Sequence, residues 1–115
     1  MLTIYHNPRC RKSRETLKLI EESGQEFQTI EYLKTPPSED ELRQLVEKLG
    51  LPVEYLIRKG EKDFIDGFKD KKIESNEWFK ILSTHPILIE RPIVVNGDQA
   101  ILGRPPENVK KLLPE

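Results

Sequence analysis

Cysteine is nearly absent from this chain of 115 residues, which contains a single one, Cys10. One thiol cannot form an internal disulfide, and no group of cysteine and histidine residues has the spacing of a structural zinc site. Long apolar runs are also missing, because the longest aliphatic stretches, 87–89 and 93–95, are only three residues long. The sequence therefore predicts no bound metal and no membrane-spanning helix.

An excess of charge of one sign is lacking as well. The 19 basic and 20 acidic side chains leave a formal net charge of -1, which argues against a nucleic-acid partner. No basic and then apolar signal sequence follows Met1. With 36% hydrophobic residues, the chain is too apolar to be disordered. We expect one domain over residues 1–115, monomeric and cytoplasmic, with no membrane partner.

The first part of the chain has the pattern of a strand, a helix and a strand. Alternating residues at 2–5 and apolar residues at 27–32 predict the two strands. The helix between them begins near Lys12, ends at Gly24 and is expected to bury its leucine and isoleucine side chains. Such a unit usually crosses over right-handed, so we expect the two strands to pair in parallel.

A helical block follows. Ser38 and Glu41 have the spacing of a capping box, and the apolar residues after them predict a helix that ends at Gly50. Residues 59–72 are rich in charge and glycine and predict a loop or an irregular helix, whereas the segment around 75–82 predicts a helix.

The last quarter of the chain predicts a hairpin and a final helix. Residues 92–95 and 99–102 are the two strands, and Asn96-Gly97 between them is a strong hairpin signal. The final helix is expected over about 107–113. The whole order is β-α-β, helices, then β-β-α, and the expected fold class is α/β.

Cys10 is the first candidate for chemistry, because it lies where the first strand meets the first helix. A helix N-terminus carries unpaired N–H groups and partial positive charge, which stabilise a thiolate. Cationic residues flank it: Arg9, Arg11, Lys12 and Arg14. We therefore expect a reactive thiol with a pKa below the ordinary value of about 8.5. The alternative is a small buried hydrophobe, which these polar neighbours disfavour.

Two known thiol motifs do not fit. A phosphatase loop of the C-x5-R type needs arginine where the chain has Thr16, and a C-x-x-C dithiol needs cysteine where it has Ser13. The segment is thus a monothiol version of a thioredoxin-type turn, and any redox cycle must take its second thiol from another molecule.

Three arginines stand at the boundaries of predicted elements: Arg58, Arg91 and Arg104. If Arg91 and Arg104 converge on Cys10, their guanidinium groups would form a fork-shaped site for a tetrahedral oxyanion. Each arginine taken alone fits an ordinary surface charge better than a ligand-binding role. His6 lies in the same turn as the thiol, where it either modulates the thiol or has a structural role.

Motifs along nearly the whole chain point to one family. They are, in order, His6-Asn7-Pro8-x-Cys10-x-x-Ser13-Arg14, Tyr32-Leu33-x-x-Pro36-Pro37, Leu56-Ile57-Arg58-Lys59, His85-Pro86-Ile87-Leu88-Ile89, Arg91-Pro92-Ile93-Val94-Val95 and Gly103-Arg104-Pro105. Together they resemble the ArsC family, the glutaredoxin-coupled arsenate reductases. The resemblance implies a thioredoxin-like core with a helical insertion over about 34–86.

The resemblance also implies roles for residues. Cys10 would be the nucleophile that attacks arsenate, and the three arginines would bind the oxyanion. His6 and Ser13 would support the thiolate. Pro92 matches the position of the cis proline of thioredoxin-like folds. Glutathione and glutaredoxin would act as co-substrates, with no bound cofactor.

Two features of the sequence depart from the family pattern, and three other functions are compatible with its residues. Arg11 and Lys12 stand where many family members have small residues, and the chain stops at Glu115 without a C-terminal extension, which predicts a shorter ArsC-like branch. One alternative is a glutathione-dependent thiol or disulfide reductase, and another is a Spx-type regulator that binds RNA polymerase. Ser13 removes the C-x-x-C switch usual in that type. A binding module without turnover is the third.

Overall fold

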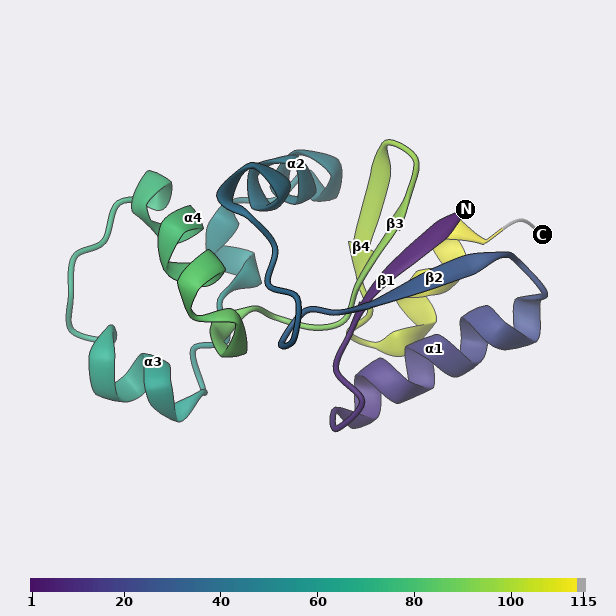
Figure 1. Ribbon diagram of the computed structural model, residues 1–115, viewed down its shortest axis with the longest axis horizontal. Helices are drawn as coiled ribbons and strands as arrows, with labels where there is room; N and C mark the ends of the chain where they lie inside the picture. Colours follow the sequence, from purple (N-terminus) through teal and green to yellow (C-terminus); the bar gives the residue numbers. More distant parts are fainter. Residues whose placement is uncertain (114–115) are drawn as a thin grey trace. The chain divides into compact units, whose positions relative to one another are not determined.

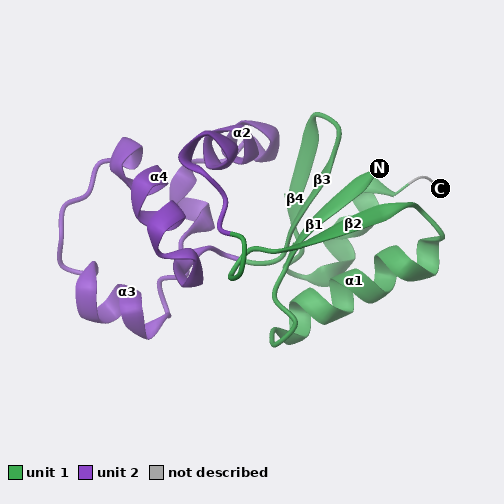
Figure 2. Cartoon of the chain, viewed as in Figure 1, with its two compact units in different colours: residues 1–35, 91–115 green, residues 36–90 purple. Residues whose placement is uncertain are grey.

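The computed structural model describes residues 1–113, which group into two compact units (Figure 2). Unit 1 contains residues 1–35 together with those from 91 onward, and unit 2 contains residues 36–90. The chain therefore leaves unit 1 after the second strand and returns to it before the third. The expected single domain with a helical insertion over about 34–86 stays a prediction.

Unit 1 is built on a four-stranded sheet in the order β2-β1-β3-β4 (Figure 1). The strands are β1, Leu2–His6; β2, Phe27–Glu31; β3, Ile93–Asn96; and β4, Gln99–Leu102. β1 and β2 pair in parallel, as the strand-helix-strand pattern predicts. β3 pairs antiparallel with both β1 and β4. The mixed α/β, thioredoxin-like fold class expected from the sequence is confirmed.

Two helical elements complete unit 1: α1, Arg11–Ser23, and η3, Pro106–Leu112. They contact each other, and Figure 1 shows both below the sheet. Buried side chains from both, together with those of the strands, form the core: Leu2, Ile4, Ile20, Val94, Val109 and Leu112. α1 ends at Gly24, whose φ of 75° is a left-handed conformation that favours glycine. This core holds α1 and η3 against the sheet.

Unit 2 is helical. Its elements are α2 Glu39–Leu49, η1 Val53–Leu56, α3 Lys62–Gly67, α4 Ser75–Thr84 and η2 Pro86–Leu88. α4 packs against α2 and η1, and buries Trp78 and Leu82. The Trp78 ring lies 6.1 Å from that of Phe64 in α3 and 5.8 Å from that of Phe68. Aromatic and aliphatic packing thus holds these short helices together.

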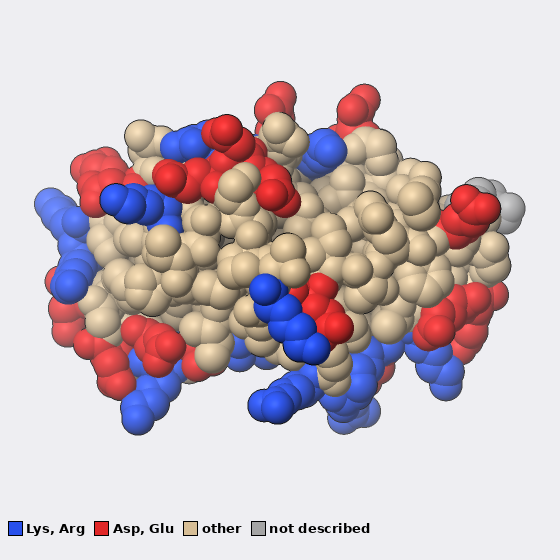
Figure 3. Space-filling model, viewed as in Figure 1, with Lys and Arg blue, Asp and Glu red and all other residues tan. Residues whose placement is uncertain are grey.

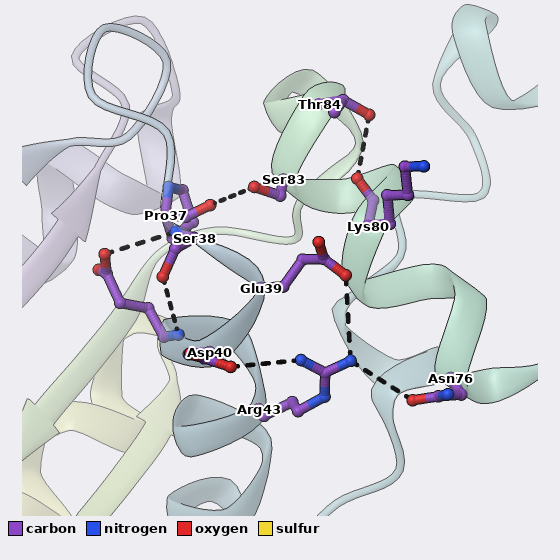
Figure 4. Close-up of polar contacts among 10 residues, drawn as sticks. Pro37, Ser38, Glu39, Asp40, Arg43, Asn76, Lys80, Ser83 and Thr84 are labelled. Carbon is purple, nitrogen blue, oxygen red and sulfur yellow. Dashed lines mark hydrogen bonds and ion pairs between the residues drawn. The ribbon is translucent and has the colours of Figure 1, made fainter.

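The capping box predicted at the start of α2 is confirmed. Ser38 Oγ accepts a hydrogen bond from the Glu41 N–H at 3.1 Å, and the Glu41 carboxylate accepts from the Ser38 N–H (Figure 4). Ser83 Oγ of α4 donates to the carbonyl of Pro37 at 2.8 Å. Local sequence therefore sets where α2 begins, and one tertiary hydrogen bond ties that end to α4.

The structure differs from the sequence prediction in a few elements. Residues 62–67 form a regular helix inside the stretch predicted as a loop or irregular helix. The final element is a 3₁₀ helix, in which residues three apart share a face, and Pro106, Val109 and Leu112 accordingly face the core. The hairpin turn places Gly97 and Asp98 at its centre, because Asn96 still pairs with Gln99.

The surface carries both signs of charge, with Lys and Arg next to Asp and Glu around the face seen in Figure 3. This matches the near-zero net charge of the sequence. Over residues 1–113, no helix is long and apolar enough to cross a bilayer.

Candidate active site

Cys10 is the N-cap residue of α1 and has extended backbone angles. Its side chain is only 8% exposed although Arg9 and Arg11 beside it are exposed, so the polar neighbours do not bring the thiol to the surface. Burial acts to raise the pKa of the Cys10 thiol, but the backbone N–H of Ser13 and the charge of Arg91 outweigh it, so the pKa is lowered. The backbone N–H of Lys12 and the charge of Arg104 act in the same direction. The direction of the shift agrees with the sequence prediction, but the charges that lower the pKa are those of Arg91 and Arg104 and not those of the cationic residues that flank Cys10.

Ser13 organises the loop that carries the thiol. Its side chain is fully buried in the first turn of α1, and its Oγ lies 2.6 Å from Nδ1 of His6. The same Oγ accepts a hydrogen bond from the Asn7 N–H at 3.0 Å. One hydroxyl thus joins the end of β1, the loop after it and the helix that Cys10 caps.

Burial lowers the pKa of His6, and the nearby charge of Arg14 adds to this effect, while Glu31 opposes it. A lowered pKa favours the neutral ring, which can accept a hydrogen bond at Nδ1. His6 therefore lies within the support of the active-site loop, and its contact is with Ser13.

Asn7 closes the turn itself, and sequence reasoning gave it no role. Its Oδ1 accepts from the Arg9 N–H, and its carbonyl accepts from the Cys10 N–H, both at 3.0 Å. An asparagine that bonds backbone two residues ahead forms an Asx-turn, for which Asn-Pro is a recognised signal. The Arg14 guanidinium adds a bond to the carbonyl of Pro8. The loop before the thiol is consequently held at several points.

Strand pairing brings two of the predicted arginines to the thiol. Because Ile93 pairs with Tyr5 in β1, the chain before β3 lies beside the chain that follows β1. Arg91 is therefore near Cys10, and Arg104 Nη1 donates to the Arg91 carbonyl at 3.2 Å. Both guanidinium charges act to lower the pKa of the Cys10 thiol.

Pro92 packs at the centre of this arrangement. It is buried, and the Arg91–Pro92 peptide bond is cis, as the resemblance predicts; the Arg104–Pro105 bond is cis too. The Gly103 N–H donates to the Pro92 carbonyl at 2.9 Å. Gly103 also approaches Thr16 of α1 so closely that a side chain has no space there. Sequence reasoning quoted Gly103 without giving it this packing role.

Arg58 belongs to unit 2, and its role in binding an oxyanion stays a prediction. Its guanidinium pairs with Glu61 at 3.1 Å, with both side chains 20% exposed. It also donates to the carbonyl of Ile87 at 3.2 Å. These two contacts fix the direction of the guanidinium within unit 2.

No cluster of three or more metal-ligating side chains occurs in residues 1–113. The reactive feature of the site is an activated thiol at a helix N-terminus, with two guanidinium groups of the same unit beside it. Such an arrangement can attack an electrophilic centre and stabilise the negative charge on oxygens around that centre.

Comparisons with known proteins agree with this chemistry. Residues 5–112 match the ArsC family. The arsenate reductase of Escherichia coli K12 is 43% identical over 99% of this chain and 82% of its own length. That of Haemophilus influenzae is 43% identical over 96% of this chain and 97% of its own. The solved arsenate reductase from Vibrio cholerae is 46% identical, covers 97% of each chain and superposes with a TM-score of 0.92.

The fold and the site define a thioredoxin-like protein in which a single cysteine with a lowered pKa caps the first helix. The chain belongs to the ArsC family.

Proposed function

We propose that this chain is an arsenate reductase in which Cys10 is the nucleophile and glutathione and glutaredoxin supply the electrons. The observation that carries the proposal is the position of Cys10 at the start of α1, where backbone N–H groups and two arginines lower its pKa. The choice of arsenate is supported by the relatives that carry this name at 43% identity over nearly the whole chain.

In the first step, the Cys10 thiolate attacks arsenic, and a sulfur–arsenic bond forms as hydroxide leaves and takes up a proton to become water. Arg91 and Arg104 bind the arsenate oxygens through charge-assisted hydrogen bonds. The resemblance to the family gives Arg58 of unit 2 an oxyanion-binding role as well. His6 and Ser13 position the loop rather than contact the substrate, because they bond to each other and to the Asn7 backbone.

In the second step, the glutathione thiolate attacks the Cys10 sulfur. A disulfide forms, the sulfur–arsenic bond breaks with its electron pair on arsenic, and arsenite leaves. The two electrons come from two thiols, and only one of them belongs to this chain. Glutaredoxin then reduces the mixed disulfide by thiol–disulfide exchange and returns Cys10 as a thiol.

Arsenite production in the presence of arsenate, glutathione and glutaredoxin tests the proposal. We expect turnover by the wild-type chain that requires both reductants, and none by Cys10→Ser, since a serine hydroxyl is a poor nucleophile at neutral pH. Reduction of disulfide substrates without any arsenite production would contradict the proposal and favour the thiol or disulfide reductase instead.

A further inference from the structure

A cavity of about 300 Å³ opens within unit 1 beside the loop that carries the thiol. One side is lined by the three residues directly before Cys10, which are Asn7, Pro8 and Arg9, and by His6. The other side is lined by residues at the end of β2 and just after it: Glu31, Leu33 and Lys34. Cys10 is not part of this lining, so a ligand in the cavity would lie beside the loop that carries the thiol, within the same compact unit.

The cavity has charges of both signs and an excess of positive charge. Arg9 and Lys34 are cationic and exposed, and Glu31 is the carboxylate in the lining. Lys34 Nζ lies 3.5 Å from Glu31 Oε1, with the two side chains 77% and 40% exposed. The pair is open to solvent, so an incoming carboxylate can compete with Glu31 for the ammonium group of Lys34.

This cavity is separate from the oxyanion arginines. Neither Arg91 nor Arg104 belongs to its lining. A molecule bound here would thus leave both guanidinium groups available to an oxyanion on Cys10. A thiol that attacks the Cys10 sulfur must be present at the same time as that oxyanion, and a separate binding region would allow both to be held together.

We propose that the cavity binds the carboxylate end of a peptide thiol of the glutathione class, with Arg9 and Lys34 as the groups that recognise the carboxylate. This inference rests on the proposed function, because it assigns a place to the thiol co-substrate. The volume lies at the lower limit of small-molecule sites, which suits one end of a tripeptide rather than the whole molecule. Arg9 offers a planar pair of N–H donors and Lys34 offers a point charge.

The test uses a reaction that needs no arsenate. In oxidised glutathione, the Cys10 thiolate attacks one sulfur, the disulfide breaks, one glutathione thiolate leaves and a mixed disulfide forms on Cys10. The uncharged 2-hydroxyethyl disulfide reacts at Cys10 in the same way but carries no carboxylate. Mass spectrometry of the intact chain gives both rates, and the ratio of the two rates cancels any change in thiolate fraction.

We expect Arg9→Gln and Lys34→Gln each to lower the rate ratio, oxidised glutathione over 2-hydroxyethyl disulfide, by about two- to fivefold, the range of exposed charge pairs. Lys18→Gln is the matched control, because Lys18 is an exposed lysine of α1 outside the cavity lining. Its ratio should equal that of the wild-type chain. Glu31→Gln should raise the ratio, because it frees Lys34 from its carboxylate partner.

The inference would be overturned if the rate ratio of all four variants equalled that of the wild-type chain. It would also be overturned if Lys18→Gln lowered the ratio as much as Lys34→Gln, since the cavity would then make no specific contribution to the reaction with oxidised glutathione. A lower ratio in Glu31→Gln would overturn the carboxylate assignment. Failure of the proposed function is a separate result: a chain that discriminates between the disulfides as expected but produces no arsenite has the thiol site without the arsenate chemistry.

Discussion

His6 Nδ1 and Ser13 Oγ lie 2.6 Å apart, and this contact joins the end of β1 to the first turn of α1, the helix that Cys10 caps. Both side chains are buried, with His6 6% exposed and Ser13 fully covered. Because Ser13 Oγ also accepts from the Asn7 N–H, the loss of this one hydroxyl would leave a buried imidazole nitrogen and a half-buried N–H without this partner.

We therefore predict that Ser13→Ala lowers the free energy of unfolding by about 1–3 kcal/mol, the usual cost of an unsatisfied buried polar group. It should also raise the pKa of Cys10, since the Ser13 N–H is a main cause of its lowering and depends on the same loop geometry. Urea denaturation and the pH dependence of alkylation measure the two effects. Ser23→Ala removes a hydroxyl from the other end of α1 and is the control; a loss no larger than in that variant would contradict the prediction.

The pH dependence of Cys10 follows from its lowered pKa. Alkylation by iodoacetamide tracks the thiolate, so the rate should rise with pH to a midpoint below about 8.5 and then level off. The chain has no other cysteine, so the folded and the denatured protein report on the same thiol. A folded-state midpoint at or above that of the denatured chain would show that the thiol is not activated.

The same shift links Cys10 to stability. A pKa that is lower in the folded state means that the unfolded chain binds more protons between the two pKa values. The contribution of Cys10 to stability is therefore complete above the unfolded pKa and is lost as pH falls through the folded one. Relative to Cys10→Ser, the wild-type chain should gain stability as pH rises through this window.

Short-range signals account for most of what the sequence predicted. The capping box at Ser38 and the stop at Gly50 depend on neighbours a few residues away, and both are confirmed. The first half of α1 behaves differently, because Ser13 and Thr16 are fully buried while Leu17 is only half-buried. Ser13 bonds to His6 of β1, and Thr16 packs against Gly103, so the groups that cover these two side chains are distant in the sequence and no local pattern predicts their burial.

In the candidate site, too, some features follow from neighbouring residues and others depend on residues far apart in the chain. Cys10 and its cationic surroundings can be identified from a few consecutive residues, because the helix begins there. The approach of Arg91 and Arg104 depends on the pairing of β3 with β1 and β4, which joins segments far apart in the chain. The spacing of the arginines gave no means to establish this convergence, and the charge-linked fall in the Cys10 pKa supports it.

We predict that Arg91→Lys and Arg104→Lys weaken arsenate binding by about 1.5–3 kcal/mol, or roughly ten- to a hundredfold, because lysine keeps the charge but loses the fork of N–H donors. The rate of Cys10 alkylation should change little, since the cationic charge beside the thiol remains. Isothermal titration with arsenate on Cys10→Ser backgrounds isolates binding from turnover. Lysine variants that bind and reduce arsenate like the wild-type chain would show that these arginines are ordinary surface charges.

Gly103 is the position where a single methyl group should disturb the site most. An added Cβ would lie 2.6 Å from Thr16 Oγ1 and 2.7 Å from Pro92 Cγ, closer than real Cβ contacts. Neither neighbour can move easily, because the Thr16 hydroxyl donates to the Lys12 carbonyl at 2.8 Å and Pro92 is a buried ring. Overpacking of this kind costs about 1–3 kcal/mol.

We therefore predict that Gly103→Ala lowers the free energy of unfolding by about 1–3 kcal/mol. It should also slow Cys10 alkylation, because the added methyl group strains α1, which Cys10 caps, and Pro92, which follows Arg91. Gly60→Ala is the matched control, because no heavy atom lies within 4 Å of its added Cβ and its φ is not in the left-handed region. That variant should be close to neutral. Thr16→Ala in the Gly103→Ala chain removes the Oγ1 and Cγ2 contacts and should restore part of the stability, which a double-mutant cycle in urea would measure. Additive effects of the two substitutions would mean that Thr16 does not meet the new methyl group. The close approach of Gly103 to α1 would then not be what excludes a side chain from position 103.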